Sequence, residues 1–130
     1  MKTHKDLNVW KNSIDLVISV YRLSRKFPKE ELFCLTQQLR RAVISVPSNI
    51  SEGAARNQTR EFIRFLRISA GSLAEVETQI VIAEKLQYLK ESESVELVGH
   101  TNKIRAQLGG LIKVLEQKLE KRQQSNRVTG

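Results

Sequence analysis

The sequence predicts an all-α protein, an antiparallel up-down-up-down four-helix bundle whose second helix is kinked by a proline. Apolar residues recur at helical spacing along almost the whole chain of 130 residues. Glycine and proline contribute only 6 and 2 residues, too few for a fold of many strands and turns. No stretch alternates apolar and polar residues as a half-buried strand does. Four amphipathic helices with short connections bury their apolar faces most simply as such a bundle.

The first helix is expected from about Asp6 to Lys26. It should end there because the residue before Pro28 is pushed away from helical geometry. The second helix is expected from about Glu30 to Ala55 or Arg56, since acidic residues in a first turn suit the helix dipole. Its apolar residues do not all point one way; they are Leu32, Phe33, Leu35, Leu39, Val43, Ile44, Val46 and Ile50. Either this helix is fully buried in a compact monomer, or another copy of the chain covers part of its surface.

The third helix is expected from about Arg60 to Leu89, with Asn57 or Thr59 as its N-cap. The fourth is expected to start at a cap formed by Ser92 or Ser94 and to run to about Arg122. A polar tail follows, so we expect one domain over residues 1–124 and a frayed tail over residues 125–130. Four glycines interrupt these helices, and close helix–helix approach is the ordinary reason to tolerate them; they are Gly53, Gly71, Gly109 and Gly110.

Composition argues against several classes of function. No apolar run is long enough to span a bilayer, and the N-terminus lacks the apolar stretch of a signal peptide, so we expect a cytoplasmic protein without a membrane partner. Cys34 is the only cysteine and is expected to be a small buried thiol. His4 and His100 have no partner at metal-ligand spacing. Glu75 and Glu77 stand two residues apart and would diverge on a helix. We therefore expect no metal, no cofactor and no catalysis.

Positive charge is segregated along the chain, which carries a net charge of +8. Basic residues outnumber acidic ones over 1–29 and 40–67, whereas acidic residues prevail over 68–112. Arginine predominates among the basic residues of 40–67, and its planar fork suits phosphate oxygens. A solvated face is the alternative interpretation of such a charge run. The candidate nucleic-acid-binding residues are Arg22, Arg25, Lys26, Arg40, Arg41, Arg56, Arg60, Arg64 and Arg67.

A polar face surrounds the proline of the second helix. Its members recur at i, i+3, i+4 and i+7 around Pro47, and they are Ser45, Ser48, Asn49 and Glu52. A proline inside a helix removes a backbone donor and should kink the helix. The polar groups either satisfy the freed carbonyls and bond across to Ser69, Ser72 or Glu75, or they contact a ligand.

Three segments resemble a known bacterial family. They are residues 7–11 (LNVWK), 38–56 (QLRRAVISVPSNISEGAAR) and 61–79 (EFIRFLRISAGSLAEVETQ). They are similar to the 23S rRNA intervening-sequence proteins, a family that includes the accessory variability determinant of diversity-generating retroelements. The resemblance implies a four-helix bundle assembled as a ring-like homopentamer with a basic surface. For the retroelement members it also implies nucleic acid and a reverse transcriptase as partners. The chain departs from the family in having Gln87 before Tyr88, where a glycine is expected.

Together these observations favour a non-enzymatic, oligomeric bundle that binds RNA or DNA backbone through one continuous arginine-rich surface. Such binding should depend steeply on salt. The alternative is a protein-interaction scaffold whose basic face binds an acidic partner such as a reverse transcriptase.

Overall fold

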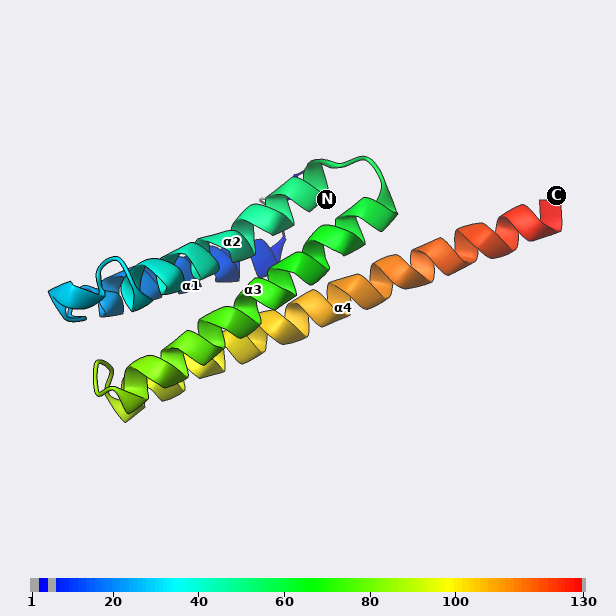
Figure 1. Ribbon diagram of the computed structural model, residues 1–130. Coiled ribbons are helices and arrows are strands. Elements are labelled where there is room, and N and C mark those ends of the chain that lie inside the picture. Colours follow the sequence, from blue (N-terminus) through cyan, green and yellow to red (C-terminus); the bar gives the residue numbers. More distant parts are fainter. Residues whose placement is uncertain (1–2, 5–6, 130) are drawn as a thin grey trace.

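Four helices form nearly all of the computed structural model, which describes residues 3–4 and 7–129. They are α1 (Asn8–Ser24), α2 (Leu35–Ala55), α3 (Thr59–Lys85) and α4 (Glu91–Thr129), and a short 3-10 helix, η2 (Lys29–Glu31), precedes α2 (Figure 1). No strand occurs in this described part of the chain. The protein is an all-α four-helix bundle, as the sequence predicts. Asp6, where we expected the first helix to begin, lies outside the described residues.

The helices enclose one apolar core. α2 packs against α1 and α3, and α4 packs against α3 and α1. Figure 1 shows successive helices running in opposite directions. The largest fully buried side chains come from all four helices and include Leu16, Leu39, Ile50, Leu66, Leu73, Ile80, Ile104 and Leu108. Each such side chain stabilises the fold by about 1.5–3 kcal/mol relative to an exposed one.

The second helix is only partly buried within one chain. Within α2, Leu39, Val43, Val46 and Ile50 lie in the core but Ile44 is exposed, and Leu32 and Phe33, which precede α2, are exposed as well. Full burial in a compact monomer is therefore wrong for this helix. The structure carries α2 through the buried Pro47, and the kink at that residue stays a prediction.

The start of α2 differs from the prediction. The segment before α2 forms tight turns whose hydrogen bonds join residues three positions apart. The Glu31 amide donates to the Pro28 carbonyl at 2.9 Å, and the Cys34 amide donates to the Glu31 carbonyl at 3.0 Å. Cys34 has φ −123° and ψ −107°, so the α-helix begins only after it. This turn moves the thiol off the buried side of α2. Cys34 is exposed, and the prediction of a buried thiol is wrong.

The helix N-termini are capped differently from the prediction. Gln58 occupies the N-cap of α3 and makes no side-chain cap bond, so neither Asn57 nor Thr59 has that role. Ser92 and Ser94 lie inside α4. The carboxylate of Glu93 instead accepts the Lys90 backbone amide at 2.9 Å. A carboxylate in the first turn also suits the helix dipole, which explains why α4 needs no serine cap.

The turn between α3 and α4 is a Schellman motif without its usual glycine. The Tyr88 amide donates to the Ala83 carbonyl at 2.8 Å, and the Gln87 amide donates to the Glu84 carbonyl at 2.8 Å. Gln87 has φ 66°, the left-handed conformation that disfavours a residue with a Cβ. The backbone therefore adopts the conformation that favours glycine, although the sequence has glutamine.

Replacing Gln87 with glycine is expected to stabilise the protein by about 1 kcal/mol, because glycine has no Cβ to strain in the left-handed region. Urea unfolding followed by circular dichroism measures this change. Gln117→Gly is the control, since Gln117 is exposed inside α4. The control should destabilise by up to about 1 kcal/mol. A loss of stability in Gln87→Gly would show that the turn does not need this conformation.

The fourth helix is longer than predicted and reaches Thr129, whereas we expected it to end near Arg122. Its last turns extend beyond the other three helices in Figure 1. Residues 120–127 are exposed and nearly all polar, so apolar periodicity could not reveal this helical extension. The domain boundary at residue 124 stays a prediction. None of the helices in the described part combines the length and apolarity that a bilayer span requires.

Candidate nucleic-acid interface

The candidate basic residues fall into two groups at opposite ends of α2. We call Arg22, Arg25, Lys26, Arg40 and Arg41 the α1–α2 basic group, and Arg56, Arg60, Arg64 and Arg67 the α3 basic group. Arg41 and Arg56 are 15 positions apart in the chain, about 22 Å along a helix axis. The connections that follow α1 and α2 lie at opposite ends of the bundle in Figure 1. The structure thus does not support one continuous surface.

Carboxylates of the same chain compensate most of the α3 basic group. Arg56 pairs with Glu52 at 3.4 Å, Arg64 pairs with Glu61 at 3.0 Å, and Arg67 pairs with Glu116 at 3.2 Å. Arg60 is exposed and has no ion pair within residues 3–4 and 7–129. Exposed pairs of this kind stabilise the fold little. Their effect here is to reduce the charge available to an anionic partner.

The pairing of Arg64 is the strongest in this group. Its Nε donates a second hydrogen bond to Glu61 Oε1 at 3.3 Å. The hydrogen bond from Arg64 lowers the pKa of Glu61, and the same bond raises the pKa of Arg64. The guanidinium carbon of Arg64 also lies 4.6 Å from the ring centroid of Phe65. Arg64 is therefore held against its own helix.

Two members of the α1–α2 basic group have partners within the chain. The Nε of Arg40 donates to the Ser24 hydroxyl at 2.9 Å, and its guanidinium carbon lies 4.7 Å from the ring centroid of Tyr21. Lys26 forms an ion pair with Glu93. The hydrogen bond from Lys26 is the main reason why the pKa of Glu93 is lowered.

The other three members carry uncompensated charge. Arg22, Arg25 and Arg41 are exposed, and no ion pair involves them in the described part of the chain. They line two adjacent hollows of about 460 and 280 Å³ between α1 and α2. No acidic residue lines either hollow. The lining of these two hollows therefore carries an excess of positive charge.

The sequence left open an exposed apolar surface that includes Leu32, Phe33 and Ile44, but sequence reasoning missed that this surface lies among these arginines. We call the surface around the two hollows the α1–α2 face; besides the arginines its lining comprises Val17, Ile18, Tyr21, Leu32, Phe33, Thr36, Gln37 and Ile44. Phe33 is 81% exposed and Ile18 is 61% exposed. Tyr21 belongs to α1 and meets Arg41 through the packing of α1 on α2, whereas Phe33 lies in the turn that directly precedes α2. Aromatic and arginine side chains side by side can stack on nucleic-acid bases.

The polar residues around Pro47 do not all face the same helix. The hydroxyls of Ser45 and Ser72 are hydrogen-bonded at 2.8 Å, as predicted for a bond across to α3. The Asn49 amide donates to the carbonyl and to the hydroxyl of Ser45, each at 2.8 Å. Ser48 is exposed and lines a hollow toward α1, while Glu52 pairs with Arg56. Ser45 therefore joins α2 to α3 and Asn49 holds Ser45 from within α2, whereas Ser48 and Glu52 make no such link.

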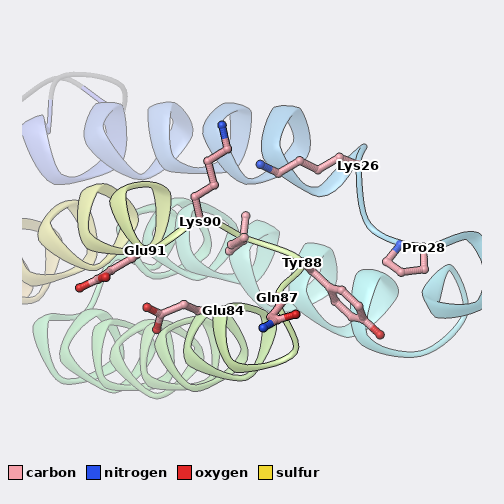
Figure 2. Close-up of a pocket in the computed structure, with 8 residues that line it drawn as sticks. Lys26, Pro28, Glu84, Gln87, Tyr88, Lys90 and Glu91 are labelled. Carbon is pink, nitrogen blue, oxygen red and sulfur yellow. The ribbon is translucent and has the colours of Figure 1, made fainter.

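Another hollow, of about 670 Å³, lies where the end of α1 meets the α3–α4 turn. Figure 2 shows Lys26 and Lys90 on one side of it and the carboxylates of Glu84 and Glu91 on the other. Tyr88 also lines it, and burial, followed by the charges of nearby glutamates, raises the pKa of its hydroxyl. Its two lysines and two glutamates balance, so this hollow lacks the excess of positive charge found at the two hollows between α1 and α2.

No three metal-ligating side chains come together in the described residues in a way that could hold an ion. Of the two glutamates considered for acid–base chemistry, Glu77 pairs with Arg105. Glu75 lines a different hollow, between α2 and α3. The two carboxylates thus have separate surroundings.

One comparison with known proteins identifies a family, and another shows the fold. The family model described as 23S rRNA-intervening sequence protein matches residues 5–110. A similar solved structure is a protein with unknown function from the S23 ribosomal protein family of Bacteroides thetaiotaomicron. It has a TM-score of 0.75 and 21% sequence identity, and the match covers 81% of this chain and 95% of that one. At this identity the likeness shows a shared fold. The comparison with curated proteins finds no match.

Proposed function

Because this chain belongs to the 23S rRNA-intervening sequence protein family, we propose that it is a non-enzymatic nucleic-acid-binding bundle of the cytoplasm. It contacts the backbone of RNA or DNA through the α1–α2 basic group. The observation that carries this proposal concerns Arg22, Arg25 and Arg41. All three are exposed, and they line two adjacent hollows whose linings contain no acidic residue. Guanidinium groups in this state bind phosphate oxygens in a bidentate manner. RNA is the first probe, since the family description names an rRNA.

A titration of fluorescently labelled structured RNA against rising salt tests this proposal. The logarithm of the association constant should fall linearly with the logarithm of salt concentration between about 50 and 200 mM, because each phosphate contact releases counterions. Fluorescence anisotropy measures both the affinity and this slope. Absence of binding at the lowest salt, or binding that salt leaves unchanged, would contradict the proposal.

We further propose that copies of the chain assemble through the apolar part of the α1–α2 face, as a homopentamer by the family resemblance. Ile18, Phe33 and Ile44 are exposed there, and contiguous apolar surface of this kind marks an interaction site. Assembly would repeat the flanking arginines around the oligomer. Light scattering should give a mass several times that of one chain, and Phe33→Ser should lower it. A monomeric wild-type protein would contradict assembly.

A scaffold that binds an acidic protein, such as a reverse transcriptase, is the second candidate function. The same mixture of exposed apolar residues and free arginines favours it, since protein interfaces are enriched in aromatic residues and arginine. In that case purified protein would fail to bind RNA at any salt concentration. It would instead form a complex with the acidic partner.

A further inference from the structure

A polar groove lies between α2 and α3 and is separate from the two hollows of the α1–α2 face. We call it the α2–α3 groove. Its volume is about 370 Å³, and it is lined by Gln38, Arg41, Ala42, Ser45, Ser72, Glu75 and Gln79. Ala42 is the only apolar member of this lining. The segments 38–56 and 61–79, which stand out in the sequence, meet here.

The packing of α2 on α3 places these polar residues opposite one another. The hydrogen bond between Ser45 and Ser72 joins the helices at one end of the groove, and Asn49 fixes Ser45 from the next turn. The two helices run in opposite directions in Figure 1. Residues one and two turns before Ser45 therefore lie across from residues one and two turns after Ser72. The result is a recess lined by polar groups from both helices.

Several of these groups have no partner in the described structure. Gln79 Oε1 is buried and accepts no hydrogen bond from any described residue. Arg41 and Glu75 line the same recess, yet neither takes part in an ion pair in the described chain. A buried acceptor without a donor is unfavourable, and a donor group of a ligand can satisfy it as well as a protein group or a water molecule can. The groove thus offers one cation, one anion and an unsatisfied acceptor to a ligand.

We infer that the α2–α3 groove holds one unpaired nucleotide of a single-stranded nucleic acid, with its phosphate on Arg41 and its base edge on Glu75 and Gln79. This inference rests on the proposed function, because Arg41 lines both the α1–α2 face and the α2–α3 groove and would guide the strand from that face into the groove. Base edges present donors and acceptors side by side, and glutamine amides match them. Proteins read such edges in single strands, where pairing does not hide them.

The acceptors in the groove select among bases. Glu75 as a carboxylate only accepts hydrogen bonds, and Gln79 Oε1 is an acceptor that lacks a donor. Both fit the exocyclic amino group of cytosine, adenine or guanine, whereas uracil offers only its ring N3–H donor, flanked by two carbonyl oxygens that these acceptors would repel. Single-stranded RNA made of cytosine should therefore bind more tightly than single-stranded RNA made of uracil. A duplex should bind through the arginines of the α1–α2 face alone.

The test compares ten-nucleotide cytosine RNA, ten-nucleotide uracil RNA and an RNA duplex by fluorescence anisotropy at one salt concentration. The wild-type protein should prefer the cytosine strand by about tenfold. Glu75→Gln and Gln79→Met should each reduce that preference, and the double variant should abolish it. Binding of the uracil strand and of the duplex should stay within about twofold. Gln58→Met is the control, because Gln58 is exposed outside the groove, and it should keep the full preference.

The outcomes separate this inference from the proposed function. Equal binding of cytosine and uracil strands by the wild type, or a preference that survives in the double variant, would overturn the inference and leave the proposed function standing. Absence of binding to all three probes would overturn both. Glu75 is exposed, so Glu75→Gln keeps the fold and gives an answer even if Gln79→Met does not fold.

Discussion

Replacing Arg22, Arg25 and Arg41 together by glutamine is expected to lower the affinity for structured RNA by about ten- to a hundredfold at low salt. These guanidinium groups are exposed and have no carboxylate partner in the described part of the chain. The slope of the logarithm of affinity against the logarithm of salt should fall in magnitude by about 2, since three phosphate contacts are lost. Anisotropy titrations at several salt concentrations measure both quantities. Circular dichroism should show an unchanged fold, because all three side chains lie on the surface.

The α3 basic group supplies a control with the same change in net charge. Replacing Arg56, Arg64 and Arg67 by glutamine also removes three positive charges, but each of these residues is paired with a glutamate. Affinity should fall less than about threefold in this variant, mainly through the long-range field. An equal loss in the two variants would mean that net charge alone, and not the α1–α2 basic group, governs binding.

Replacing Gly53 with alanine is expected to destabilise the protein by about 1–3 kcal/mol, the usual range for overpacking. A Cβ at this position would lie 2.7 Å from Phe65 Cβ, 3.1 Å from Phe62 Cδ1 and 3.3 Å from the Phe62 carbonyl oxygen. Neither the Phe65 Cβ nor the carbonyl can move without shifting α3, the helix to which they belong. Thermal unfolding followed by circular dichroism should show a clear drop in the midpoint.

Gly71→Ala is the matched control for Gly53→Ala and should have the opposite sign. A Cβ at Gly71 would meet nothing within 4 Å, and Gly71 is exposed in the middle of α3. Alanine there should stabilise by about 0.5–1 kcal/mol, because it restricts the unfolded chain and favours the helix. Two substitutions of the same type would then shift the midpoint in opposite directions. A Gly53→Ala variant as stable as the wild type would contradict the close approach of α2 to α3 at Gly53.

The helical architecture could be predicted because apolar periodicity carries it. Leu39, Val43, Val46 and Ile50 recur at helical spacing and all lie in the core. The late start of α2 could not be predicted, since Glu30 and the apolar residues after it suit a first helical turn as well as they suit a 3-10 turn. The contacts of this segment with the rest of the fold decide between the two conformations.

The reason for the glycines in the helices could also be predicted only in part. Close helix–helix approach was predicted for four of them, and it holds at Gly53 but not at Gly71, Gly109 or Gly110.

The candidate site was predictable in composition but not in arrangement. The pairs Glu52–Arg56 and Glu61–Arg64 follow helical spacing of four and three residues, so the sequence alone contains that signal. The partner of Arg67 is Glu116, which is 49 positions away and is brought close only by α3–α4 packing. The placement of Arg41 beside Tyr21 likewise depends on how α1 packs on α2. A count of basic residues along the sequence therefore overestimates the free positive charge of the α3 basic group.

Chemical modification of arginine in the wild-type complex tests the central claim most directly. Phenylglyoxal reacts with accessible guanidinium groups, and mass spectrometry of peptides gives the extent of reaction at each position with and without bound RNA. The account predicts that RNA protects Arg22, Arg25 and Arg41. It predicts that Arg60, which is exposed and unpaired in the described chain but lies in the α3 basic group, stays as reactive as in the free protein. Protection of Arg60 with unchanged reactivity of the other three would contradict the account.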